Sequence, residues 1–139
     1  MIEIDAIDHV VLRVIDAEAM ERFYCDVLGC SVDTRRDDLG MVQLRAGASL
    51  IDLVRVDGRL GLQGGRAPGA QGHNMDHLCL RLAHYDEPAI LEHLRAHGVR
   101  IGPLGTRKGA LGTGPSVYLY DPQGNTVELK GPADRQEGR

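Results

Sequence analysis

Two short stretches of the chain share the same order of polar and apolar residues. Ile7–Val14 reads Ile-Asp-His-Val-Val-Leu-Arg-Val, and Met75–Leu82 reads Met-Asp-His-Leu-Cys-Leu-Arg-Leu, half a chain length later. Both alternate as expected of a β-strand with one face in a core. A match at this spacing indicates a duplicated unit, in which His9 and His77 occupy equivalent positions.

A second match supports the duplication. Ser49–Leu53 corresponds to Asn125–Leu129, and in each stretch an acidic residue lies between apolar residues. Asp52 and Glu128 are therefore also equivalent. The chain is interpreted as two copies of one unit, with small insertions in the second copy.

Each copy is predicted to fold as a strand, a helix and three further strands. In the first copy, Asp16 is a suitable N-cap, and Gly29 ends the helix because glycine readily adopts the left-handed conformation. The strands that follow are expected at Cys30–Arg36, Met41–Ala46 and Ser49–Val56.

The second copy repeats this order. Asp86 is expected to cap a helix that runs through His97, and Gly98 to end it. The Gly-rich stretch Thr106–Pro115 has two interpretations, a lid or a phosphate loop, and the second is weakened because no helix follows the glycines. The closing strands are expected at Val99–Ile101, Pro115–Tyr120 and Asn125–Gly131.

One helix covers only one face of its sheet, so neither copy is expected to be stable alone. We therefore predict a single α+β domain over residues 1–139. In it, two βαβββ modules (about 5–57 and 75–131) form a curved, roughly eight-stranded mixed sheet with helices on the outer face and a concave metal-binding cleft. The Gly-rich segment of about 58–74 is predicted to be a mobile linker.

Composition narrows the classes of function. A net charge of −4, with scattered basic residues, argues against nucleic acid as the main partner. Three cysteines without a metal-binding or paired spacing are expected to be reduced thiols. No signal peptide and no apolar run of about 20 residues are evident, so we expect a cytoplasmic protein that does not bind a membrane.

Period-2 alternation places His9 and His77 on the inner face of the predicted sheet, together with Asp52 and Glu128. Two imidazoles and two carboxylates suit one divalent metal of borderline softness: Zn, Ni, Mn or Fe. The alternative is that these are ordinary strand histidines and solvated acids. The symmetric positions of all four residues favour the metal site.

The paired Asp-His strands, the repeated βαβββ order and the ending Tyr-Asp-Pro-Gln-Gly-Asn-Thr-Val-Glu-Leu (Tyr120–Leu129) resemble the vicinal oxygen chelate superfamily. The resemblance extends over about residues 5–131. Members of this superfamily include glyoxalase I, methylmalonyl-CoA epimerase, fosfomycin-resistance transferases, extradiol dioxygenases and bleomycin-resistance proteins.

The resemblance implies that His9, His77 and Glu128 are metal ligands. Asp52 stands where glyoxalase I has a fourth ligand, a glutamate, and its side chain is one methylene shorter. Direct coordination, coordination through water and no coordination are therefore all open for Asp52.

The resemblance also implies a chemistry. A divalent ion chelates two adjacent oxygens of a substrate and stabilises an enediolate-type intermediate, and Glu128 or Asp52 is the expected catalytic base. Arg13 is a candidate substrate-binding residue, because glyoxalase I uses an arginine at this spacing to bind a carboxylate of its thiol cofactor; the alternative is a solvated edge arginine. Lys108 is a second candidate for binding an anionic substrate.

We expect a metal-dependent, glyoxalase I-like lyase or isomerase that acts on a small substrate with adjacent oxygens. One alternative is a non-haem iron extradiol-type dioxygenase, since two histidines and a carboxylate also form an iron triad. Thiol transfer to an antibiotic, and sequestration of a drug or metabolite without catalysis, are further alternatives. A homodimer is expected because open strand edges favour pairing, either with the modules paired within each chain or swapped between chains.

Overall fold

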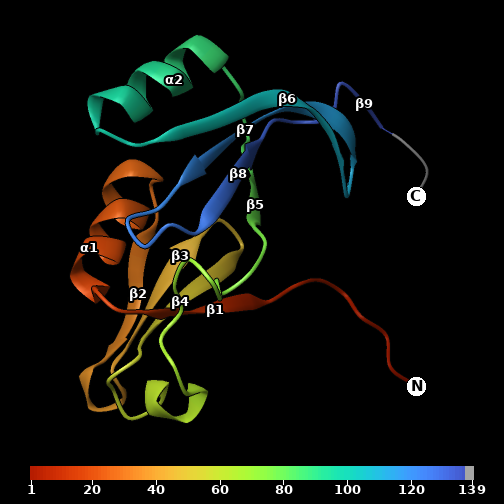
Figure 1. Cartoon of the computed structure of the whole chain (residues 1–139). Coiled ribbons are helices and arrows are strands. Elements are labelled where there is room, and N and C mark those ends of the chain that lie inside the picture. Colours follow the sequence, from red (N-terminus) through yellow and green to blue (C-terminus); the bar gives the residue numbers. More distant parts are fainter. Residues whose placement is uncertain (137–139) are drawn as a thin grey trace. The chain divides into compact units, whose positions relative to one another are not determined.

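The computed structural model describes residues 1–136, which form two compact units that meet in sequence at Asn74 and Met75. Each unit contains one predicted copy (Figure 1). The strands of the first unit are β1 (His9–Val14), β2 (Ser31–Arg36), β3 (Met41–Ala46) and β4 (Ser49–Arg55). Those of the second are β5 (Leu78–Arg81), β6 (Ile101–Gly109), β7 (Gly112–Tyr120), β8 (Thr126–Lys130) and the short β9 (Arg135–Gln136).

The two sheets have the same topology. The strand order is β1-β4-β3-β2 in the first sheet and β5-β8-β7-β6 in the second, where β9 also pairs with β7. The pairs β1–β4 and β5–β8 are parallel, and the remaining pairs are antiparallel. This confirms the α+β class and the duplicated βαβββ order.

The helices begin and end at the predicted residues. The Asp16 carboxylate accepts a hydrogen bond from the Ala19 amide at 3.0 Å and caps α1 (Ala17–Arg22), which continues as a π-helical turn, η1 (Phe23–Val27). Gly29 follows with a φ of 79°. The second copy repeats this pattern: Asp86 caps α2 (Glu87–Ala96), and Gly98 follows the helix with a φ of 68°.

Apolar residues of the last strand in each unit lie in the core. Ile51 and Leu53 on β4 are buried, as are Val127 and Leu129 on β8. Because side chains alternate along a strand, the acidic residue between each pair points to the opposite sheet face. We call this face, which carries Asp52 in the first unit and Glu128 in the second, the polar face of each sheet.

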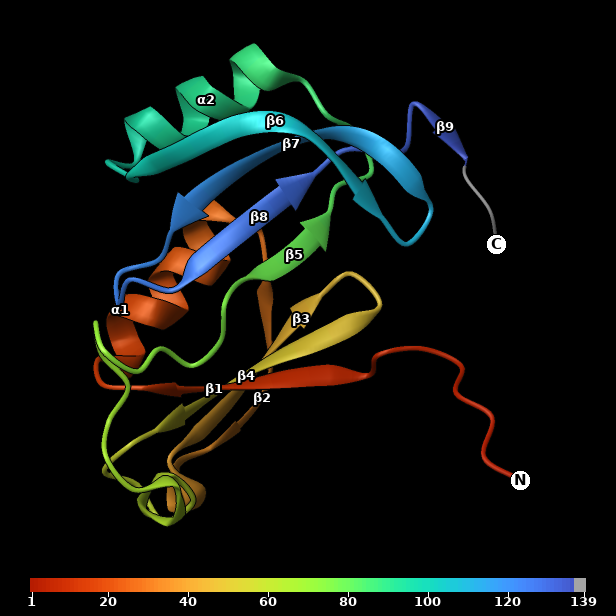
Figure 2. The same ribbon diagram turned by 45° about the vertical axis from the view of Figure 1, so that its right-hand side comes forward.

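The Gly-rich stretch Thr106–Pro115 is neither a lid nor a phosphate loop. It is the end of a long hairpin, in which β6 runs to Gly109 and β7 begins at Gly112 (Figure 2). A Cβ atom on Gly114 would lie 2.5 Å from the carbonyl oxygen of Pro132, so close backbone contact requires glycine there. The predicted strands Val99–Ile101 and Pro115–Tyr120 were therefore too short.

The Gly-rich segment after β4 is attached to β1 through Arg13. The Arg13 guanidinium donates hydrogen bonds to three backbone carbonyls of this segment, those of Gly61, Gly65 and Arg66, at 2.8–3.0 Å. The segment contains one short 3₁₀ helix, η3 (Gly61–Gly64); the other 3₁₀ helix, η2 (Asp37–Leu39), lies between β2 and β3. Asn74 bonds to the backbone of Arg13 in both directions, so the segment is held at its far end as well.

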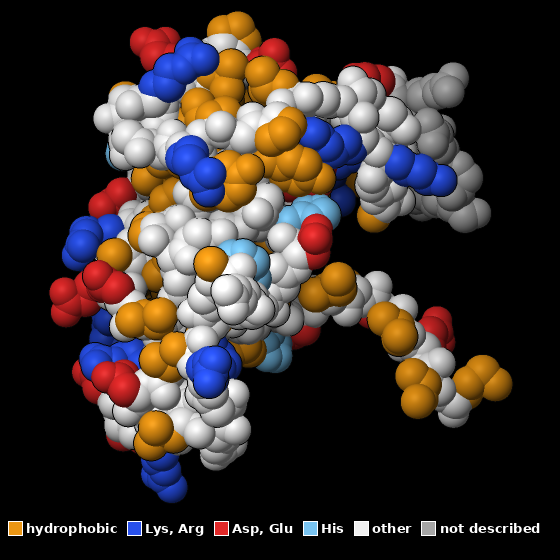
Figure 3. All heavy atoms as spheres, viewed as in Figure 1, with side chains coloured by type: hydrophobic (Ala, Val, Ile, Leu, Met, Phe, Trp, Pro, Cys, Tyr) orange, Lys and Arg blue, Asp and Glu red, His pale blue; other side chains and the backbone are white. Residues whose placement is uncertain are grey.

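Apolar side chains are exposed along the N-terminal segment that precedes β1, where they are seen as a row in Figure 3. Met1, Ile2, Ile4 and Ile7 all have more than four fifths of their surface accessible. Among the described residues, no helix has the length and apolar character needed to span a membrane.

A buried aspartate shapes the turn that precedes β8. One Asp121 oxygen accepts hydrogen bonds from the amides of Gln123 and Asn125 at 2.9 and 3.0 Å, and the other accepts from the Asn125 side chain at 2.8 Å. Gly124 completes the turn with a φ of 89°. This turn sets the start of β8 and hence the position of Glu128.

We predict that Asp121→Ala lowers the free energy of unfolding by about 2–4 kcal/mol, because it removes three hydrogen bonds and leaves buried donors without partners. Urea denaturation monitored by circular dichroism measures the change. Asp5→Ala, in the exposed N-terminal segment, is the control and should change stability by less than about 0.5 kcal/mol. Equal stability of the two variants would contradict this role of Asp121.

Candidate functional site

In the first unit, Asp52 lies on the polar face with one oxygen free to bind a cation. Its side chain is buried, and Oδ2 accepts a hydrogen bond from Gln43 Nε2 at 3.1 Å. Among the described residues, Oδ1 is also buried and has no hydrogen-bond partner. An unpaired buried carboxylate oxygen costs about 1–3 kcal/mol, and more when it is charged, so this atom is suited to a metal ion or a water ligand.

His9 is the first residue of β1, and its side chain is held by the preceding residue. His9 Nδ1 lies 2.7 Å from Asp8 Oδ2. The hydrogen bond to Asp8, assisted by the charges of Asp52 and Asp8, raises the pKa of His9 despite some desolvation. A histidine held through Nδ1 presents Nε2, which is the usual arrangement of metal-ligating histidines.

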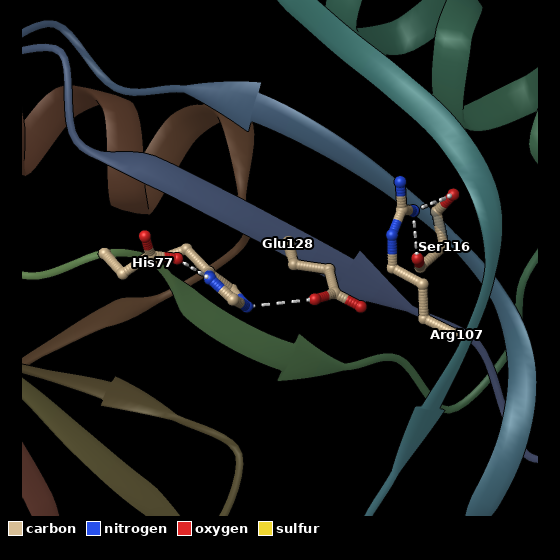
Figure 4. A network of polar contacts seen from close by, with 5 residues as sticks. His77, Arg107, Ser116 and Glu128 are labelled. Carbon is tan, nitrogen blue, oxygen red and sulfur yellow. Dashed lines mark hydrogen bonds and ion pairs between the residues drawn. The ribbon is translucent and has the colours of Figure 1, made fainter.

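The second unit repeats this arrangement and brings its histidine and carboxylate into contact. His77 Nδ1 lies 2.6 Å from Asp76 Oδ2, and His77 Nε2 lies 3.2 Å from Glu128 Oε1 (Figure 4). Glu128 is only 5% exposed. Consecutive residues within a strand point to opposite faces, so the Asp-His contact is possible because Asp76 and His77 precede β5.

Glu128 has defined neighbours on both sides. The strand register places it between Cys79 on β5 and Tyr118 on β7. The ring of His77 meets that of Tyr118 edge to face, at 5.3 Å between centroids. Partial burial, followed by the charge and a hydrogen bond of Glu128, raises the pKa of the Cys79 thiol to about 11. The thiol is therefore protonated at neutral pH and can donate to the carboxylate.

Two basic residues of the second unit, Arg107 and Lys130, were not identified from the sequence. Arg107 Nη1 donates to Ser116 Oγ at 2.5 Å, and its guanidinium lies over the Tyr118 ring, 4.2 Å from the centroid. Figure 4 shows Arg107 beside the strand that carries Glu128. Lys130 could have been found by alternation, because it follows Glu128 by two residues on β8; Arg107 depends on the register of the long hairpin.

Arg13 and Lys108, the two residues predicted to bind substrate, are not among the neighbours of Glu128 described above. Arg13 donates to the backbone carbonyls described above. Lys108 pairs with Thr113, and alternation places both on the sheet face opposite to Arg107 and Glu128. A role of Arg13 or Lys108 in substrate binding stays a prediction, and the register favours Arg107 over Lys108.

The residues of each unit fit part of a metal site. In the described residues, no group of three or more His, Cys, Asp or Glu side chains is close enough to hold a metal. In the second unit His77 contacts Glu128, and in the first unit the charge of Asp52 acts on His9. Two zinc ligands in tetrahedral geometry lie about 3.3 Å apart when each bond is about 2.0–2.1 Å long. The 3.2 Å between His77 Nε2 and Glu128 Oε1 matches this separation.

Comparisons with known proteins identify relatives of this chain. A relative, the virulence protein STM3117 of Salmonella typhimurium (strain LT2), is 35% identical over 129 residues, which cover 91% of this chain and 83% of the relative. Its crystal structure superimposes with a TM-score of 0.77 at 30% identity, covering 94% of this chain and 98% of that one.

Two more distant structures share the fold. Lactoylglutathione lyase from Agrobacterium tumefaciens has a TM-score of 0.65 at 23% identity and covers 91% of this chain and 92% of its own. The fosfomycin resistance protein FosX from Listeria monocytogenes, in complex with Mn(II) and sulfate, has a TM-score of 0.69 at 17% identity and covers 95% of this chain and 94% of its own.

A family model described as the glyoxalase/bleomycin resistance protein/dioxygenase superfamily matches residues 6–129, which include both modules and all four predicted metal ligands. Some proteins with this fold bind a divalent metal and act on small molecules. The chain belongs to the glyoxalase/bleomycin resistance protein/dioxygenase superfamily.

Proposed function

We propose that this protein is a metal-dependent enzyme of the glyoxalase I type, a lyase or isomerase that acts on a small substrate with two adjacent oxygens. One divalent ion (Zn, Ni, Mn or Fe) is held by His9, His77 and Glu128. The observation that carries the proposal is the pair formed by His77 Nε2 and the buried Glu128 carboxylate, 3.2 Å apart. The Asp8–His9 contact of the first copy repeats the arrangement by which Asp76 holds His77.

When bound, such an ion polarises two adjacent substrate oxygens and makes the neighbouring C–H more acidic. Glu128 is suited to accept that proton, because its carboxylate is buried and is flanked by the neutral thiol of Cys79 and the imidazole of His77. Asp52 is the second candidate base, because Gln43 holds one of its oxygens and leaves the other available.

A dioxygenase is the second candidate function. If Asp52 keeps its hydrogen bond to Gln43 and does not bind the metal, the remaining ligands are two histidines and one carboxylate, the set used by non-haem iron oxygenases. Oxygen uptake by the Fe(II)-loaded protein with a catechol substrate would favour this function. A protein that sequesters a small molecule would bind its ligand without turnover under either condition.

We expect about one divalent metal per chain in protein purified without added metal. His77→Ala and Glu128→Ala should each lose most of it, because a site with three protein ligands rarely survives the removal of one. Plasma emission spectrometry measures the content. His73→Ala, which changes an exposed histidine outside the site, is the matched control. Equal metal content in wild type and His77→Ala would refute the metal site.

The role of Asp52 is tested by an isosteric substitution. Asp52→Asn should keep most of the metal, since we expect a shorter side chain than glutamate to contact the ion through water, and it should reduce turnover at least about tenfold if Asp52 is the base. A screen of α-hydroxy and α-keto compounds identifies the substrate. Metal content and steady-state rates on that substrate then distinguish these effects. Loss of the metal would show a direct ligand, and full turnover would leave Glu128 as the base.

Asp8 should control the pH range in which His9 binds metal. Its hydrogen bond raises the pKa of His9 above the ordinary 6.5, so the ion pair stabilises the fold below that ordinary value and is lost as the pH rises through the raised value. Metal needs neutral His9, so binding should weaken as the pH falls through the same raised value.

In Asp8→Asn, an NMR titration of the metal-free protein should therefore show the pKa of His9 shifted downward. Asp5→Asn, which changes another carboxylate of the N-terminal segment, should leave it unchanged. An unaltered pKa of His9 in Asp8→Asn would show that the Asp8 contact does not operate in solution.

A further inference from the structure

We propose that the second unit contains an oxyanion-binding subsite formed by Lys130 and Arg107, and hence that the substrate carries an anionic oxygen group such as a carboxylate, sulfate or phosphate. This inference rests on the proposed function, because it places the anionic group of the substrate beside Glu128.

Lys130 is a buried cation without a carboxylate partner. Its side chain is 5% exposed, and the single hydrogen bond found for Nζ within residues 1–136 is a long one, 3.5 Å, to the carbonyl oxygen of Gly131. No acidic group of the described chain lies within 4.0 Å of the ammonium. Lysines are rarely this buried unless paired, so the geometry indicates that an anion completes the surroundings of Lys130.

The stem of Lys130 is held in place by the hairpin. A Cβ atom on Gly109 would lie 3.0 Å from Lys130 Cε and 3.1 Å from Cδ, so the stem packs directly against this glycine. The ammonium is thereby fixed before any ligand binds. A fixed donor loses less conformational entropy on binding than a free surface lysine.

Arg107 supplies a second, equally fixed cation. Ser116 accepts from Nη1 through both its hydroxyl and its carbonyl oxygen, and the Tyr118 ring supports the plane of the guanidinium. An arginine has five N–H donors in a rigid fork, so one edge can be anchored while the rest binds an oxyanion. Arg107, like Lys130, has no ion pair with the acidic residues of the described chain.

Ser116 places the two cations on the same face. It is the cross-strand partner of Lys130 in the β7–β8 register, and its hydroxyl is bonded to Arg107. Glu128 precedes Lys130 by two residues and therefore shares this face, about 6.6 Å away along the strand. A substrate whose anionic group lies a few bonds from its reacting carbon would meet both the subsite and the candidate base.

The subsite is tested by titrating the protein, as purified, with sodium sulfate and separately with sodium acetate, against sodium chloride at constant ionic strength. The measured quantity is the melting temperature by differential scanning fluorimetry. Wild type should show a saturable rise with sulfate, acetate or both. Lys130→Met keeps the stem and removes the charge, and it should weaken the apparent affinity at least about tenfold, as should Arg107→Gln.

Arg95→Gln is the control, because it removes an exposed positive charge of α2 in the same unit, and it should respond like wild type. Equal responses of wild type, Lys130→Met and Arg107→Gln, or no response of wild type to either anion, would overturn the proposal. If Lys130→Met does not fold, the comparison of Arg107→Gln with wild type tests the proposal. If the purified protein contains metal but wild type does not respond to either anion, only the subsite is refuted. If the purified protein contains no metal but responds to an anion in the predicted way, the metal site is refuted and the subsite is not.

Discussion

The parallel pairing between the first and last strand of each module is the constraint on which the candidate site depends. The register sets Val11 opposite Asp52 in the first unit and Cys79 opposite Glu128 in the second. Each acid thus lies on the strand that pairs with β1, which begins at His9, or with β5, which begins directly after His77. A slip of one residue would exchange the polar and apolar faces and place the carboxylates in the core.

Apolar burial on one face stabilises the position of a carboxylate on the other. In β8, buried apolar residues precede and follow Glu128, and the same holds for Asp52 in β4. The sheets therefore keep two acids buried at fixed places although a buried charge is costly. A bound cation would offset that cost, which explains how residues that destabilise the isolated fold can serve a metal site.

Much of this arrangement could be predicted because it depends on local signals. The caps Asp16 and Asp86 and the alternation around Glu128 are properties of short stretches. Because the unit is duplicated, each of these patterns occurs twice, which strengthens the prediction. The contact of Asp76 with His77 was harder to predict from the sequence, because alternation alone would point consecutive side chains to opposite faces. The contact can be predicted only if one knows that β5 begins at Leu78, after both residues.

The parts that could not be predicted depend on contacts between distant residues. The glycines of the hairpin suggest a loop in the sequence, whereas in the structure Gly114 lies within β7 and allows it to approach the backbone at Pro132 closely. The hairpin register then decides that Arg107, and not Lys108, shares the face of Glu128. Lys130 is unusual through its burial, which sequence patterns do not reveal.

The central claim is that the equivalent histidines of the two copies bind one metal ion. Electron spin-echo envelope modulation of the Mn(II)-loaded protein, labelled with ¹⁵N-histidine, tests this directly. We predict couplings to two histidine nitrogens in wild type. In the small fraction of Mn(II) that the variants still bind, one coupling is lost in His9→Ala and the other in His77→Ala. A bound Mn(II) with no histidine coupling, or with couplings that both substitutions leave intact, would contradict the account.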